Sequence, residues 1–79
     1  MPATPLKYRI FRDARLLAAG TLRDEGHNVE VCRQVKRAHG LGTGDIVVLD
    51  CAGRALCYEI NGPLGAQAIA RPEYVAVQA

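Results

Sequence analysis

The segment from Ile46 to Ile60 constrains the fold of this chain more than any other part of the sequence. An apolar run over residues 46–49 leads into Ala52-Gly53, which favours a tight turn, and a second largely apolar run returns over residues 56–60. This pattern predicts a β-hairpin. With a two-residue turn, one face of the hairpin holds Val47, Leu49, Leu56 and Tyr58, and the other holds Ile46, Val48, Ala55 and Cys57. Both faces are largely apolar, so each needs a covering layer.

The length of the chain limits how those two faces are covered. Its 79 residues make a single small domain, residues 1–79, with one core. A chain this short, with one short helix, has difficulty supplying two covering layers. We therefore predict a homodimer in which the hairpin contributes to a shared core. The predicted dimer core consists of Ile46, Val47, Val48, Leu49, Leu56 and Tyr58.

The amino-terminal third predicts another hairpin. Apolar and basic residues alternate from Leu6 to Phe11, which is the period of a half-buried strand. Asp13-Ala14 offers a turn, and residues 16–22 return as a second strand, although Ala18, Ala19 and Gly20 are poor strand formers.

Two alternatives describe the segment that follows the polar loop over residues 23–28. In the first, residues 29–31 form a brief strand and a short helix runs from Arg33 to His39, ending at Gly40. In the second, Asn28 caps a longer helix that buries Val29, Cys32 and Val35. Periodicity does not choose between them.

The remaining sequence is less regular. Asn61-Gly62-Pro63 ends the second hairpin, residues 64–70 predict a loose helical turn, and Tyr74 to Val77 alternate as an edge strand does. We treat residues 61–79 as a carboxy-terminal extension. The fold class expected from these elements is α+β, mostly β: an amino-terminal β-hairpin, one short central helix and a second β-hairpin, arranged as a small sheet or as an interleaved dimeric barrel.

Catalytic chemistry has little support in the sequence. There is no serine, neither His27 nor His39 has neighbours typical of a catalytic or metal site, and Cys51 and Cys57 are expected to fill the hairpin core. The glycines at 40, 42 and 44 lie between a helix and a strand, which is the reverse of a phosphate-binding loop. We expect no enzyme activity, no metal and no cofactor.

The cellular setting is inferred from cysteine usage and hydropathy. Three cysteines without a C-x-x-C pair do not suggest a disulfide framework, and the longest apolar runs are too short for a membrane span of about 20 residues. We therefore expect a cytoplasmic protein without a membrane partner.

Basic residues are concentrated towards the front of the chain. The net charge is only +2, yet Arg33, Lys36 and Arg37 fall at helical spacing and Arg23 precedes them in the loop. Two interpretations of this cluster are open: it is a solvated face that keeps a small domain soluble, or, doubled in a dimer and joined by Arg23, it neutralises several phosphates without reading base sequence.

The stretch Val29-Glu30-Val31-Cys32-Arg33-Gln34-Val35-Lys36-Arg37-Ala38-His39-Gly40-Leu41-Gly42-Thr43-Gly44-Asp45-Ile46-Val47-Val48-Leu49 resembles the core of the AbrB/MazE-like swapped-hairpin regulators. In that family a strand leads into a short basic helix, a Gly-Asp turn and another strand, and the likeness extends from Arg23 to Ile60. It implies two chains with interleaved hairpins. It also implies DNA binding by Arg23 and Asn28, with Lys36 and Arg37 matching the basic helix pair.

These observations predict a small dimeric DNA-binding transcriptional regulator or antitoxin-like protein that binds double-stranded DNA through Arg23, Asn28, Arg33, Lys36 and Arg37. The alternative is a small phage- or plasmid-encoded inhibitor or adaptor, similar in kind to an anti-CRISPR protein, that uses the same basic surface on an acidic protein partner.

Overall fold

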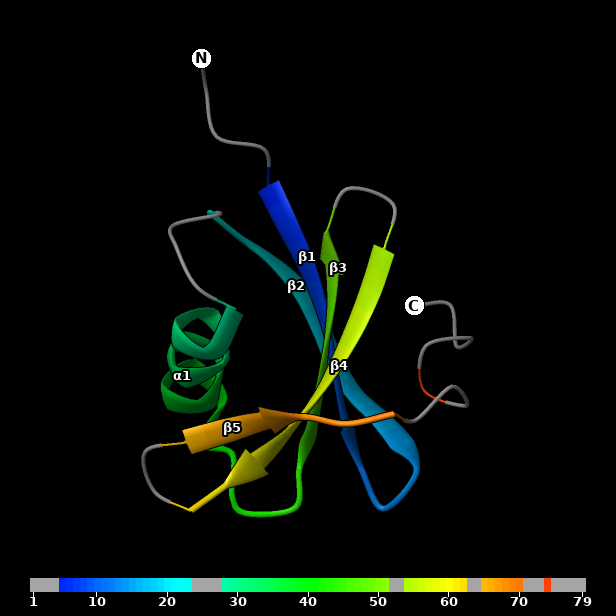
Figure 1. Cartoon of the computed structure of the whole chain (residues 1–79), viewed down its shortest axis with the longest axis vertical. Coiled ribbons are helices and arrows are strands. Elements are labelled where there is room, and N and C mark those ends of the chain that lie inside the picture. Colours follow the sequence, from blue (N-terminus) through cyan, green and yellow to red (C-terminus); the bar gives the residue numbers. More distant parts are fainter. Residues whose placement is uncertain (1–4, 24–27, 52–53, 63–64, 71–73, 75–79) are drawn as a thin grey trace.

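The described residues form one five-stranded antiparallel sheet and the helix α1 (Asn28–His39) (Figure 1). The computed structural model describes residues 5–23, 28–51, 54–62, 65–70 and 74. Along the chain the elements are β1 (Pro5–Arg12), β2 (Arg15–Arg23), α1 (Asn28–His39), β3 (Ile46–Cys51), β4 (Arg54–Asn61) and β5 (Gly65–Ala68). The strands lie in the order β2-β1-β3-β4-β5. The predicted α+β, mostly β fold with two hairpins and a central helix is confirmed, and its sheet is open.

The first hairpin turns through two residues in the left-handed region. Asp13 has a φ of 51° and Ala14 a φ of 63°, which is the backbone conformation of the tight turns that suit the twist of a β-hairpin. The register of β1 and β2 then shifts, because Phe11 lies opposite Leu16 whereas Ile10 lies opposite Ala18. Leu17 is the additional residue, so β2 carries a β-bulge close to the turn.

The longer of the two predicted helices is correct, and the brief strand over residues 29–31 is wrong. The helix buries Val31, Cys32 and Val35, a spacing that places apolar side chains on one helical face. Val29 is only half-buried. The buried face of the helix therefore contains Val31 where we had predicted Val29.

The end of α1 follows from the sequence as predicted. Gly40 has a φ of 64°, and the Leu41 amide donates a hydrogen bond of 3.0 Å to the Lys36 carbonyl. A glycine in the left-handed region followed by a buried apolar residue is a common way to close a helix. Leu41 is buried in the core beneath α1, which turns the chain back towards the sheet.

The predicted second hairpin has the expected register. Val47 lies opposite Tyr58 and Val48 opposite Cys57, so the two faces of the hairpin contain the residues that the alternation assigned to them. Val47 and Leu49 belong to the larger core, which also contains residues of β1 and the buried face of α1. Figure 1 shows α1 against that side of the sheet.

The other face of the sheet has a second, smaller core. Its buried residues are Phe11, Ile46, Val48, Cys57 and Tyr74, and Ala55 and Ile69 pack against them. The Phe11 and Tyr74 rings lie 4.9 Å apart between centroids. Residues from the carboxy-terminal segment therefore cover the face for which we expected a second chain.

This arrangement changes the argument for a dimer. Residues 46–49 of the predicted dimer core are buried within the chain, while Leu56 and Tyr58 are half-buried. Both apolar faces of the hairpin are thus covered by residues of the same chain. The homodimer remains a prediction, but the need to cover these faces no longer supports it.

The segment after β4 is more regular than predicted. Residues 65–68 form β5, which pairs with β4 so that Ile60 lies opposite Ala66, and the predicted loose helical turn there is wrong. Tyr74 has a helical backbone, so it does not begin the predicted edge strand, whose other residues lie outside the described part of the chain. No described segment forms a helix with the length and apolar character that crossing a bilayer requires.

Candidate binding surface

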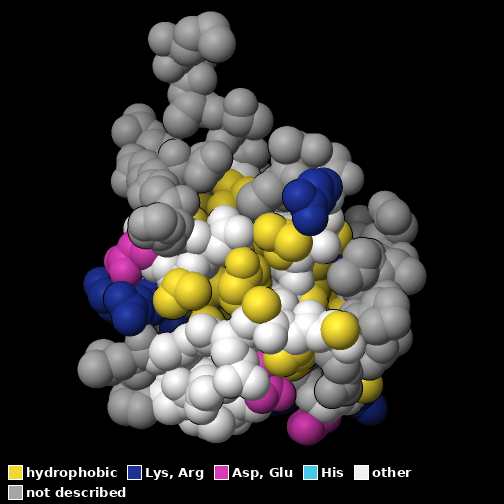
Figure 2. Space-filling view, viewed as in Figure 1, with side chains coloured by type: hydrophobic (Ala, Val, Ile, Leu, Met, Phe, Trp, Pro, Cys, Tyr) yellow, Lys and Arg dark blue, Asp and Glu magenta, His cyan; other side chains and the backbone are white. Residues whose placement is uncertain are grey.

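The exposed face of α1 brings three of the predicted DNA-binding residues together. Arg33, Lys36 and Arg37 project from successive turns of α1, and Figure 2 shows basic side chains gathered over this helix beside acidic ones. Arg33 and Arg37 are exposed, and Lys36 is half-buried. We call these three residues the α1 basic patch.

Arg33 and Lys36 of the patch each contact another part of the chain. Arg33 Nη1 lies 3.2 Å from Glu30 Oε2, in a pair whose side chains are both more than two-fifths exposed, and such surface pairs contribute little to stability. Lys36 Nζ donates a 3.0 Å hydrogen bond to the Gly62 carbonyl, which links α1 to the turn after β4. Both contacts orient the side chains while the surface stays open to solvent.

The other two predicted DNA-binding residues lie elsewhere. Asn28 Nδ2 donates a hydrogen bond of 3.0 Å to the hydroxyl oxygen of Tyr58, so this amide joins the start of α1 to β4. Arg23 ends β2 opposite Pro5, and its side chain lies outside the described part of the structure. The structure therefore groups three of the five predicted residues.

One further arginine, Arg9, is used inside the fold. Arg9 is 6% exposed, its Nη2 lies 3.2 Å from Asp50 Oδ1, and its Nη1 lies 3.4 Å from the Tyr74 carbonyl oxygen. A buried guanidinium requires such charge and hydrogen-bond partners. Arg9 thereby helps to hold Tyr74 on the second core, so it does not contribute to a basic surface.

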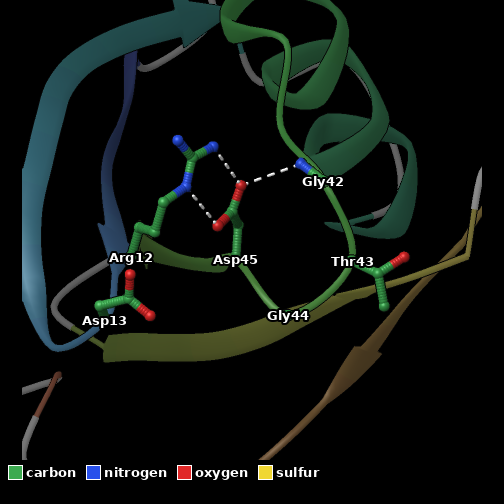
Figure 3. A pocket seen from close by; sticks show the side chains of 6 residues that line it. All are labelled: Arg12, Asp13, Gly42, Thr43, Gly44 and Asp45. Atoms are coloured by element: carbon green, nitrogen blue, oxygen red, sulfur yellow. Dashed lines mark hydrogen bonds and ion pairs between the residues drawn. The ribbon is translucent and has the colours of Figure 1, made fainter.

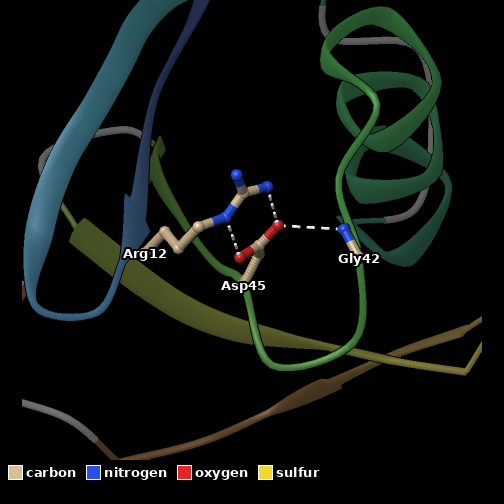
Figure 4. A network of polar contacts seen from close by, with 3 residues as sticks. All are labelled: Arg12, Gly42 and Asp45. Carbon is tan, nitrogen blue, oxygen red and sulfur yellow. Dashed lines mark hydrogen bonds and ion pairs between the residues drawn. The ribbon is translucent and has the colours of Figure 1, made fainter.

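Arg12 and Asp45 form the strongest polar contact among the described residues. Arg12 Nε donates to Asp45 Oδ1 at 2.9 Å and Arg12 Nη2 to Oδ2 at 2.7 Å, while the Gly42 amide donates to Oδ2 at 2.9 Å (Figure 4). The hydrogen bonds from Arg12 lower the pKa of the Asp45 carboxyl, burial opposes this change, and the Gly42 amide and the Arg12 charge add to the lowering.

A pocket of about 370 Å³ lies beside this network, lined by Arg12, Asp13, Gly42, Thr43, Gly44 and Asp45 (Figure 3). Its two central charged groups neutralise each other and use their hydrogen-bonding capacity on one another. The arrangement therefore serves to lock the turn over residues 42–45 onto the end of β1. In the sequence Asp45 stands directly before the apolar run at residues 46–49, and this position is the local sign of its structural role.

His39 also has a structural partner that the sequence did not reveal. The Tyr8 hydroxyl and His39 Nε2 are 2.8 Å apart, and their rings meet edge to face with centroids 5.6 Å apart. The Tyr8 ring passes over Gly20 of the neighbouring strand, where a Cβ atom would lie 2.6 Å from the hydroxyl oxygen. This contact joins the end of α1 to the β1–β2 hairpin.

The described cysteines are core residues. Cys32 and Cys57 are free thiols and are buried, which confirms the expected core position of Cys57, while the side chain of Cys51 lies outside the described structure. Burial raises the pKa of the Cys32 thiol to about 12, and the charge of Cys57 adds to this effect. Cys32 therefore lacks the thiolate character that a nucleophile requires.

No group of three or more histidine, cysteine, aspartate or glutamate side chains comes together in the described part of the chain. His27 lies outside it. Comparison with protein-family models, with curated proteins and with solved structures found no match to this chain.

Proposed function

We propose that this protein is a small DNA-binding regulator or antitoxin-like protein whose α1 basic patch contacts the phosphate backbone of double-stranded DNA. The observation that carries the proposal is the convergence of Arg33, Lys36 and Arg37 on one exposed helical face. Three cations on a convex surface suit an extended anionic polymer better than a small molecule, which prefers a concave site. Asn28 is left out of the proposed site because its amide is bound to Tyr58.

The proposed contact is electrostatic and independent of base sequence. Three neutralised phosphates predict that raising salt from about 50 to about 200 mM weakens binding about 40-fold, because each released counterion adds to the salt dependence. A homodimer, which we retain in the proposal, presents two patches and has a steeper dependence. Arg23, at the end of β2, is a further candidate for a phosphate contact.

The test is a fluorescence-anisotropy titration of a random-sequence DNA duplex at both salt concentrations, with the mass of the protein measured by light scattering. The variant Arg33→Ala/Arg37→Ala should bind more weakly and should lose only about fourfold affinity per patch over the same salt range, because one phosphate contact is left in each patch. The matched control is Lys7→Ala/Arg54→Ala, which removes the same charge from two exposed positions outside α1.

The control separates a local site from an effect of net charge. Near wild-type binding by the control together with weak binding by the α1 variant supports the proposal. Equal losses in both variants would mean that total charge drives the interaction. If the wild-type protein ignores DNA but binds polyglutamate through the α1 patch, the protein is an acidic-partner adaptor or inhibitor and the DNA proposal is wrong.

A further inference from the structure

The strand β2 forms one edge of the sheet, and β5 forms the other. The outer edge of β2 has the features of a surface that binds an added strand. We propose that the outer edge of β2 binds an extended acidic segment of a partner protein, which adds a sixth antiparallel or parallel strand to the sheet. This interaction uses a surface other than the α1 basic patch, because residues 15–22 of β2 include none of the three residues of that patch.

The backbone of β2 supplies the first observation. It is the longest described strand, with nine residues, and no described strand pairs with its outer edge. About half of the residues in an edge strand direct their amide and carbonyl groups away from the sheet, where they bond to water or to an added strand. The other edge is β5, which has only four residues and lies beside α1.

The side chains of β2 permit close approach. Its centre consists of Ala18, Ala19, Gly20 and Thr21, so no large side chain obstructs a neighbouring backbone. Next to this stretch lie Leu16 and Leu17, the large apolar residues that are exposed among those described, at 41% and 48%. Added strands gain affinity from backbone hydrogen bonds and selectivity from apolar contacts of this kind.

The bulge explains why both leucines are exposed at one place. Leu17 is the additional residue between Leu16, which lies opposite Phe11, and Ala18, which lies opposite Ile10. A bulge interrupts the alternation of side chains and increases the local twist. Leu16 and Leu17 therefore lie side by side on the surface where β2 begins, and we call these two residues the apolar step.

Charge identifies the chemistry of the partner. The described hairpin of β1 and β2 contains the basic residues Lys7, Arg9, Arg12, Arg15 and Arg23 and one acidic residue, Asp13. Arg9 and Arg12 are neutralised by Asp50 and Asp45. Lys7 and Arg15 are exposed, so the surface around the edge has an excess of positive charge, which complements an acidic strand.

The same charges disfavour a second copy of β2 as the occupant. Antiparallel pairing of two β2 strands about Ala19 places Arg15 of each strand opposite Arg23 of the other, and like charges directly opposite one another destabilise a ladder. A partner strand with carboxylates at those positions replaces this repulsion with attraction.

The test uses two probe peptides titrated into the ¹⁵N-labelled full chain and followed by NMR. Both are acetylated peptides of alternating threonine and valine with the length of β2; one has glutamate at each end and the other has lysine. We expect amide shifts concentrated in residues 15–23 and about tenfold tighter binding of the glutamate-ended peptide. Arg15→Glu should abolish this preference, whereas the control Arg54→Glu, at an exposed position on β4, should retain it.

Leu17→Lys tests the apolar step without altering the ladder partners of β1 and should weaken both peptides. The proposal is overturned if saturating peptide leaves the β2 amides unshifted, if the shifts map to α1 or β5, or if the lysine-ended peptide binds equally well. It is also overturned if light scattering and amide protection show that a second copy of the chain occupies the β2 edge.

Discussion

Arg12 and Asp45 form a two-point ion pair, with contacts of 2.9 and 2.7 Å, that joins the end of β1 to the start of β3. Their Cα positions are not ladder partners, because β1 and β3 pair only as far as Phe11 and Ile46. The side chains thus continue the contact between the two central strands beyond the last backbone pair. The Gly42 amide, which also donates to Asp45, brings the turn after α1 into the same network.

Removing the Asp45 carboxylate should destabilise the fold. Asp45→Asn keeps one acceptor but loses the charge, and we expect the free energy of unfolding to fall by about 1–2 kcal/mol. The measurement is urea denaturation followed by circular dichroism. Glu30→Gln is the matched control, because it removes a carboxylate from an exposed pair with Arg33 and should change stability by less than about 0.5 kcal/mol. Equal effects of the two substitutions would contradict a structural role for the Asp45 network.

Stability should also depend on the charge of Asp45 at low pH. The pKa of Asp45 is lowered in the folded state, chiefly by hydrogen bonds from Arg12, so the folded protein favours the ionised form more strongly than the unfolded chain does. Its contribution is therefore complete above the ordinary carboxyl pKa of about 3.9 and is lost as pH falls through the lower folded value. Urea midpoints measured across the acidic range should show this loss, and Asp45→Asn should show a shallower one. Parallel acid profiles would refute the assignment.

The sequence predicts elements well where the signal is local. Alternation from Leu6 to Phe11 marks β1, and the two apolar runs between Ile46 and Ile60 mark β3 and β4 together with the residues on each face. Gly40 marks the end of α1 because few other residues adopt its positive φ without strain. These features depend on neighbours within a few positions.

The missed features depend on contacts between distant segments. β5 consists of glycine, alanine and glutamine residues that have little strand preference, and it is a strand because β4 offers a free edge to it. Tyr74 covers the second core through Phe11 and Arg9, more than sixty residues earlier in the chain. Periodicity carries no information about either contact.

The candidate site was predicted in part for the same reason. Helical spacing places Arg33, Lys36 and Arg37 on one surface, so these residues were grouped correctly. The spacing did not indicate that Asn28 would reach Tyr58, thirty positions away. It also did not reveal that Arg9 and Arg12 would be neutralised inside the chain.

Gly20→Ala should destabilise the protein through the Tyr8 ring. A Cβ at position 20 would lie 2.6 Å from the Tyr8 hydroxyl oxygen and 2.7 Å from Cζ, and the ring is held in place by the core and by His39. We expect a loss of about 1–3 kcal/mol in the free energy of unfolding. The matched control is Gly42→Ala, where a Cβ would meet no atom within 4 Å and the change should stay within about 0.5 kcal/mol.

The Tyr8→Leu background identifies the cause. Leucine lacks the para atoms that a Cβ at position 20 would meet, so Gly20→Ala should cost less in that background than in the wild type. Urea denaturation of the wild type, the two single variants and the double variant gives four free energies of unfolding. The difference between the two costs of Gly20→Ala is the coupling energy between positions 8 and 20. An unchanged cost would show that the clash with the ring is not the reason for glycine at this position.

Ala14→Gly should increase stability, which distinguishes it from most glycine substitutions. Ala14 has a φ of 63°, where an L side chain is strained by about 1–2 kcal/mol. Glycine removes this strain, but it also raises the entropy of the unfolded chain, which lowers stability by about 0.4–1 kcal/mol. The expected net gain is about 0.5–1 kcal/mol, and the resulting Asp-Gly pair is favoured in this type of turn. Ala19→Gly, the same change at an exposed position within β2, should instead lower stability by about 0.5–1 kcal/mol. Urea denaturation of both variants decides the matter, because a decrease in both would mean that the turn at residues 13 and 14 carries no strain that glycine relieves.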